Sequence, residues 1–157
     1  ATLVPERREE VTTEGGLDVI ANRNRLESVI PRLFDAGIAE VALFVDPDLD
    51  QIDACAASGA NGIELHTGDY ANASNWEERQ YVLGRMAAAA ERAHQNGLRV
   101  HAGHGLDLNN YPDFGAAVPH LYEVSIGFAV IARALFKGIR TSVSEMKQIV
   151  ESTTYVN

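Results

Sequence analysis

Apolar residues are gathered in short runs bounded by turn residues, and these runs predict the strands of the protein. The clear runs are 41–45, 62–66, 98–102 and 122–126, and residues 2–5 read as the end of a further strand. Their length and β-branched content are typical of buried parallel strands rather than of hairpins.

Apolar residues spaced three and four apart predict helices between the strands. The clearest example is 25–36, whose apolar positions form one helical face. Two helix starts carry capping signals, since Asp46 precedes Pro47 and Ser74 stands three residues before Glu77. The other predicted helices are 47–57, 74–95, 129–136 and 142–150.

The strand and helix alternation continues to the end of the chain, which predicts an α/β domain with a parallel sheet. An open doubly wound sheet and a closed (β/α)8 barrel both satisfy this order. The chain holds about five βα units, whereas a (β/α)8 barrel takes about 250 residues. The barrel therefore requires that residues 1–157 are the C-terminal part of a single barrel domain, with the N-terminal units absent from this sequence. A strand that enters at residue 2 favours that interpretation.

Composition limits the classes of function. The 157 residues include 22 Asp and Glu against 13 Lys and Arg, a net charge of −9, which argues against nonspecific nucleic-acid binding. No apolar run has the roughly 18 to 20 residues of a membrane span, and the first residues do not resemble a signal peptide. A single cysteine, Cys55, cannot form an intramolecular disulfide. We therefore predict a soluble, cytoplasmic protein.

Candidate chemistry lies where the predicted strands end, because the carboxyl ends of parallel strands face the site in both architectures. In the segment 64–68, the period of two places Glu64 and His66 on one face. A carboxylate inside an apolar strand needs a partner, and His66 is the nearest candidate. A lone histidine is otherwise more often a packed core residue, so both interpretations of His66 stay open.

Glycines accompany the other candidate positions. His104 stands at the lip of the sheet between two glycines, at the end of the segment 101–105. Gly127 begins a helix directly after a strand, where backbone N–H groups bind anions, although it also reads as a simple turn glycine. Thr12 lies in a polar loop after the first strand and can offer a hydroxyl to a ligand.

A metal site is disfavoured by the spacing of the histidines. His101 and His104 are three residues apart across a strand end, which turns their rings in different directions. His94 and His120 fall near a helix end and in a loop, and we expect both at the solvated surface.

A set of collinear segments carries a resemblance to a known family. The segments are 4–6, 12–19, 64–68, 70–71, 102–106, 126–127 and 145–147. Together they resemble the pyridoxine 5'-phosphate synthase family, and the resemblance covers essentially the whole chain.

The resemblance implies a (β/α)8 TIM barrel and a transferase of pyridoxine (vitamin B6) biosynthesis. Such enzymes condense 1-deoxy-D-xylulose 5-phosphate with 3-amino-2-oxopropyl phosphate, close the pyridine ring, and release phosphate and water. The resemblance implies no metal or organic cofactor. It implies small phosphorylated substrates as partners and a symmetric homo-oligomer, commonly an octamer.

The resemblance also implies roles for individual residues. His104 would be the general acid, and Glu64 would stabilise transition states. Independently of the resemblance, His66 and His101 are candidates for a supporting role beside these two. Substrate binding would fall to a second set, Thr12, Gly105, Gly127 and Phe128.

The chain departs from the family pattern at Phe128, where the family has His, and at Ser125, where it has Asn. A backbone N–H contact survives the change at 128, whereas an imidazole role does not. His101 also replaces a frequent Asn and could influence His104. The family's other catalytic His and Glu and its phosphate-binding arginine belong to units absent here, so we predict that this chain alone is inactive.

Two other functions stay open. Another phosphate-binding barrel, of isomerase or aldolase type, would need a Schiff-base lysine or a metal, but Lys137 and Lys147 fall on the closing helices. A non-catalytic barrel portion would bind a phosphorylated metabolite or a partner subunit without turnover.

Overall fold

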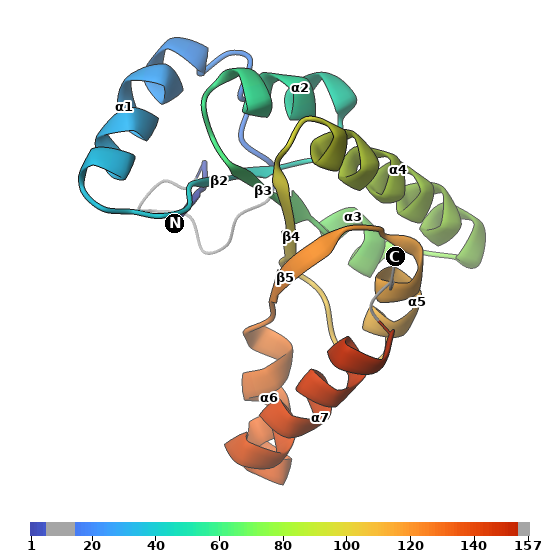
Figure 1. Cartoon of the computed structure of the whole chain (residues 1–157). Helices are drawn as coiled ribbons and strands as arrows, with labels where there is room; N and C mark the ends of the chain where they lie inside the picture. Colours follow the sequence, from blue (N-terminus) through green and yellow to red (C-terminus); the bar gives the residue numbers. More distant parts are fainter. Residues whose placement is uncertain (6–14, 154–157) are drawn as a thin grey trace.

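Five parallel strands form one sheet, and their order in space follows their order in the chain (Figure 1). The computed structural model describes residues 1–5 and 15–153. Each strand pairs in parallel with the next. This order lacks the reversal that defines a doubly wound sheet, so these five strands do not form one. The strands are β1 (Thr2–Leu3), β2 (Ala42–Val45), β3 (Gly62–His66), β4 (Arg99–Gly103) and β5 (Leu121–Ser125).

Helices alternate with the strands and close the chain. In Figure 1, α2 and α4 lie together over the sheet, and α6 and α7 pack against each other after β5. None of the helices in the described part of the chain is long and apolar enough to cross a membrane. The helices are α1 (Arg23–Asp35), α2 (Leu49–Ala57), α3 (Gly68–Asn72), α4 (Trp76–Gln95), α5 (Tyr111–Ala117), α6 (Phe128–Lys137) and α7 (Ile139–Thr153).

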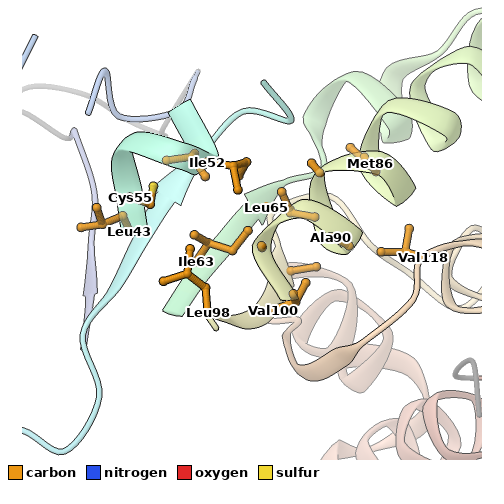
Figure 2. Close-up of a cluster of buried hydrophobic side chains, with 14 of the residues drawn as sticks. Leu43, Ile52, Cys55, Ile63, Leu65, Met86, Ala90, Leu98, Val100 and Val118 are labelled. Atoms are coloured by element: carbon orange, nitrogen blue, oxygen red, sulfur yellow. The ribbon is translucent and has the colours of Figure 1, made fainter. Parts of the chain in front are cut away.

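The apolar core lies between the sheet and helices α2 and α4. Figure 2 shows Met86 and Ala90 of α4 beside Leu65 and Val100 of the sheet. Each large aliphatic side chain buried in this layer contributes about 1.5–3 kcal/mol relative to an exposed one. Alternate residues of three neighbouring strands are buried here, namely Leu43, Val45, Ile63, Leu65, Val100 and Ala102.

The opposite face of the same strands carries polar residues. Phe44, Glu64 and His101 are neighbours in the register, and His66 and Gly103 form the next pair toward the carboxyl ends. Glu64 and His101 are only 5% and 7% exposed. Because charged groups are rarely buried without partners, this face is where functional contacts are to be sought.

The predicted α/β architecture with parallel strands is confirmed. The four clear strands match the observed ones to within one residue at each end, and the predicted helices match to within three. The sequence did not predict α3 and α5, because helices of 5 and 7 residues are too short to show a repeating apolar face.

The predicted cap of α2 is wrong. Asp48 is the N-cap, and its carboxylate accepts hydrogen bonds from the N–H groups of Asp50 and Gln51 at 2.9 and 3.1 Å. Pro47 therefore lies before the helix rather than at its first position. This leaves the carboxylate of Asp46 available for another contact.

The predicted cap of α4 is also displaced, by one residue. Asn75 rather than Ser74 is the N-cap, and its side-chain oxygen accepts a hydrogen bond of 2.9 Å from the N–H of Glu78. In return, the Glu78 carboxylate accepts one of 2.8 Å from the N–H of Ser74. The chemistry of a capping box is present, with Asn75 and Glu78 in place of Ser74 and Glu77.

Asn75→Ala is expected to lower the free energy of unfolding by about 1 kcal/mol, because the N–H of Glu78 loses its acceptor. Urea unfolding followed by circular dichroism measures this change. Ser74→Ala is the matched control, since Ser74 contributes its backbone N–H, which alanine retains. A larger loss for Ser74→Ala than for Asn75→Ala would contradict the assignment.

Cys55 is fully buried, and burial raises the pKa of its thiol to about 12. The native protein is therefore expected to react with Ellman's reagent at pH 8 only as fast as it opens, whereas the urea-unfolded chain reacts at once. The unfolded thiol ionises near its ordinary pKa of 9.0. This group thus stabilises the fold below pH 9, and that contribution is lost as the pH rises toward 12. Immediate labelling of the native protein would contradict the burial.

Candidate active site

Polar side chains gather at the carboxyl ends of β2, β3 and β4. Glu64 and His66 come from β3, Asp46 follows β2, and His104 follows β4. The ring of Phe44 in β2 contacts both histidines, with centroids 5.2 Å from His66 and 4.5 Å from His104. Because the carboxyl ends of parallel strands meet at one edge, residues far apart in the chain are brought together here.

The Glu64 carboxylate is paired with His104. Its Oε1 lies 3.5 Å from Nδ1 of His104, and its Oε2 accepts a hydrogen bond of 3.1 Å from the hydroxyl of Thr2. The side chain of Glu64 is 6% exposed and that of His104 is 38% exposed. A buried carboxylate thus supports an imidazole that solvent and ligands can reach, which suits proton transfer.

The predicted pairing of Glu64 with His66 is wrong, although the two residues share a face as predicted. They are separated along one strand by two residues, about 6.6 Å. His66 lies at the end of β3, where its ring turns toward Asp46. The chain after β4 brings His104 to Glu64 instead.

Asp46 and His66 form a second carboxylate–imidazole pair. Nδ1 of His66 donates to Oδ1 of Asp46 at 2.9 Å. This hydrogen bond holds the pKa of the Asp46 carboxyl below its ordinary value, partial burial opposes the shift, and the N–H of Gly16 adds to it. The sequence pattern predicted only a capping role for Asp46, although its place directly after β2 was a signal for the site. The pair fixes the tautomer of His66 with the proton on Nδ1.

The backbone on both sides of His104 requires glycine. A Cβ at Gly103 would overlap the Glu64 carboxylate. His104 and Gly105 have φ values of 66° and 118°, so the chain leaves β4 through left-handed conformations. A Cβ at Gly105 would lie 2.8 Å from that of Ala71. A side chain at either glycine would therefore displace the pair or the loop that carries His104.

A cavity of about 870 Å³ opens beside His104, between the segments that follow β4 and β5. Its walls are residues 104–109 and 125–129, together with Ala132 and Arg133 of α6. Four predicted site residues therefore line one cavity: His104, Gly105, Gly127 and Phe128. Gly127 is the N-cap of α6 and provides no side chain to cap it. The first N–H groups of α6 thus remain free of a side-chain cap at the cavity wall.

The structure does not bring His101 together with His104. Nε2 of His101 lies 2.6 Å from the carboxylate of Glu40, which also pairs with Arg99. The ring of Tyr122 is 5.7 Å from that of His101. The backbone of His101 is in register with Glu64, but its side chain is paired with Glu40, which precedes β2, and it does not line the cavity.

His94 is exposed, as predicted, but His120 is not fully solvated. The two rings stack with centroids 3.8 Å apart and planes 7° apart. His120 has φ of 60°, its side chain is 15% exposed, and its Nε2 lies 2.9 Å from the Glu91 carboxylate. The left-handed turn at His120 directs the ring toward α4 rather than toward solvent.

Two further expectations concern Thr12 and a metal. Thr12 lies outside the described residues. Within residues 1–5 and 15–153, no three His, Cys, Asp or Glu side chains are grouped so as to hold a metal ion. His66 and His104 are instead each paired with a carboxylate.

Comparison with known proteins gives close relatives. Three of these relatives are proteins named pyridoxine 5'-phosphate synthase. The one from Salinibacter ruber is 61% identical over 96% of this chain. Those from Magnetococcus marinus and Legionella pneumophila are 53% identical over 94% and 50% identical over 100% of this chain. These alignments cover 62%, 60% and 63% of the relatives, so the chain spans about three fifths of their length. Among solved structures, a chain of the Amycolatopsis orientalis BexX/CysO complex aligns over 90% of this chain and 55% of its own, with a TM-score of 0.48 and 14% identity.

A family model also matches nearly the whole chain. Its description is pyridoxal phosphate biosynthesis protein PdxJ, and the match covers residues 1–152. The matched region contains every described residue of the candidate site. The resemblance seen in the sequence motifs is therefore confirmed, and the chain belongs to the PdxJ family of pyridoxal phosphate biosynthesis proteins.

Proposed function

We propose that the protein containing this chain is a pyridoxine 5'-phosphate synthase. It condenses 1-deoxy-D-xylulose 5-phosphate with 3-amino-2-oxopropyl phosphate, closes the pyridine ring, and releases phosphate and water. The observation that supports this most directly is the Glu64–His104 pair beside the cavity. The names of the relatives support the same reaction.

The proposed fold of the whole domain is a (β/α)8 barrel, of which residues 1–157 form the C-terminal five units. Five parallel strands in chain order support it, because a barrel adds each strand beside the previous one. The length of the relatives supports it as well, since about two fifths of each lies outside the alignment. In such a barrel the polar face with Glu64 and His101 is the interior.

His104 is proposed as the general acid. When the amine of one substrate has added to the ketone of the other, the nitrogen lone pair forms the C=N bond and the C–O bond breaks. A proton from the His104 imidazolium allows that oxygen to leave as water. The Glu64 carboxylate, at ion-pair distance, offsets the positive charge on the ring and on the developing imine.

Phosphate binding is proposed at Gly105, Gly127 and Phe128, through backbone N–H groups. The start of the ten-residue helix α6 lies at the cavity wall and favours an anion there. Phe128 is 89% exposed, and a contact through its backbone N–H does not require its ring. Thr12 is proposed to contact the deoxyxylulose phosphate. Because the net charge is −9, attraction of the substrates has to be local.

His66 is proposed to support the reaction through its pair with Asp46, next to His104. A supporting role for His101 would act at a distance, from the cluster with Glu40 and Arg99. We further propose a cytoplasmic homo-oligomer, an octamer by resemblance, whose partners are the two phosphorylated substrates. A Schiff base on either lysine of this chain is disfavoured, since Lys137 ends α6 and Lys147 pairs with Glu151 within α7.

The test is a coupled assay of the complete gene product with both substrates, which should form pyridoxine 5'-phosphate. His104→Asn is expected to reduce kcat by about 10²–10⁴-fold, the usual contribution of a general acid. Asparagine tolerates the left-handed backbone at this position, so the fold should persist by circular dichroism. Product from the unaltered protein, formed at the strongly reduced rate by the variant, supports the assignment. Bound phosphates without any product would favour the binding-only alternative.

Asp46→Asn is expected to lower kcat by about tenfold or more, because an amide can donate to Nδ1 and so favour the other tautomer of His66. The low pKa of Asp46 keeps it ionised at neutral pH, so the variant also removes a full charge there. Glu91→Gln is the matched control, since Glu91 pairs with His120 at the same 2.9 Å but at the other end of the sheet. Equal effects of the two variants on kcat would remove His66 from the mechanism.

A further inference from the structure

We infer that Thr67 is the positioning residue that holds His104 in its working conformation. The inference rests on the proposed function, in which His104 is the general acid. Thr67 follows β3 directly and does not line the cavity. It therefore acts on the reaction only through the loop that carries His104.

The hydroxyl of Thr67 links the ends of β3 and β4. Thr67 is fully buried, and its Oγ1 lies 2.8 Å from the carbonyl oxygen of Gly103 and 2.8 Å from that of His104. Its N–H donates a third hydrogen bond, of 3.2 Å, to the Gly103 carbonyl. A buried side chain thus contacts both carbonyl groups that flank the His104 Cα.

The convergence of two successive carbonyls on one hydroxyl depends on the conformation of His104. In an extended strand, successive carbonyl groups point to opposite sides, so one donor cannot reach both. At His104 the φ of 66° ends the strand and turns its carbonyl to the same side as that of Gly103. A single hydroxyl proton can then be shared between two acceptors. The Thr67 hydroxyl therefore fits the turned conformation observed at His104 and excludes the extended one.

This form needs support, because residues other than glycine disfavour positive φ. A second anchor lies one residue further, where the side-chain amide of Asn110 donates to the Gly105 carbonyl at 2.9 Å. On the remaining side, the Cβ of Ala71 occupies the place where a side chain at position 105 would lie. Of these anchors, Thr67 alone contacts the carbonyl of His104 itself.

The direction of the imidazole follows from this backbone. The left-handed form places Nδ1 at 3.5 Å from Glu64 and the ring centroid at 4.5 Å from that of Phe44. If φ returned to negative values, the Cα–Cβ bond would point elsewhere and both contacts would be lost. Without the Thr67 hydroxyl, the His104 carbonyl loses its donor and the loop is free to make that change.

The test compares Thr67→Val, which keeps the shape but lacks the hydroxyl, with Thr67→Ser, which keeps the hydroxyl. In the complete protein, Thr67→Val is expected to lower kcat by about 10- to 100-fold through misplacement of the acid, with KM within about twofold. Thr67→Ser should stay within about threefold of the unaltered kcat. Thr153→Val is the matched control, because the Thr153 hydroxyl also donates to a carbonyl, that of Ile149, outside the site. An unchanged kcat for Thr67→Val, or an equal loss for Thr67→Ser, would overturn the inference.

A double-mutant cycle with His104→Asn shows whether Thr67 acts through His104. In that background, Thr67→Val should lower kcat by no more than about twofold, because the group it positions is already absent. The same 10- to 100-fold loss in both backgrounds would assign Thr67 a general structural role instead.

A measurement without turnover separates this inference from the proposed function. The nuclear Overhauser effect between the His104 and Phe44 rings should be present in the unaltered protein and in Thr67→Ser, and absent in Thr67→Val. Its persistence in Thr67→Val would refute the positioning role even if no reaction is found. Absence of product together with the expected ring contacts would refute the proposed function and leave the positioning role standing.

Discussion

A carboxylate buried within a sheet has to be paired, and the site is organised around this requirement at Glu64. Thr2 donates to one of its oxygens, and His104 approaches the other. Gly103 lacks a side chain where the carboxylate lies. The left-handed turn at His104 then carries the ring to its partner. One buried carboxylate thus accounts for three features: the contact from β1, the glycine at 103, and the turn after β4.

Two carboxylate–imidazole pairs are built in the same way, each with its acid from one strand and its histidine from the next. The two pairs differ in which residue, the acid or the histidine, is buried. In one pair the acid Glu64 is buried and His104 is open to the cavity, whereas in the other His66 is buried and Asp46 is half exposed. Because only an accessible imidazole can exchange protons with a ligand, this difference favours His104 over His66 for the proposed proton transfer. The enclosed His66 is better suited to holding its neighbours in place.

The phosphate recognition proposed for this strongly acidic chain has to depend on local rather than overall charge. The cavity wall combines the N-terminus of α6 with the glycine-rich ends of β4 and β5, where the backbone can be approached closely. In the proposed function, backbone N–H groups would attract an anion there even though the chain as a whole carries −9. This arrangement also explains how Phe128 can stand where the family pattern has histidine, since a backbone contact does not depend on the side chain.

The sequence by itself determined the alternation of elements, the parallel sheet, and the positions of Glu64, His66 and His104 at strand ends, because periodicity and turn residues are local properties. It also carried the family motifs. Only the tertiary structure decided which residues pair, namely His104 with Glu64 and Asp46 with His66. It alone showed that the Thr67 hydroxyl contacts the backbone on both sides of the His104 Cα. The physical reason is that partner choice depends on how neighbouring strands align and on the backbone angle at one residue. Neither quantity leaves a pattern in the local sequence.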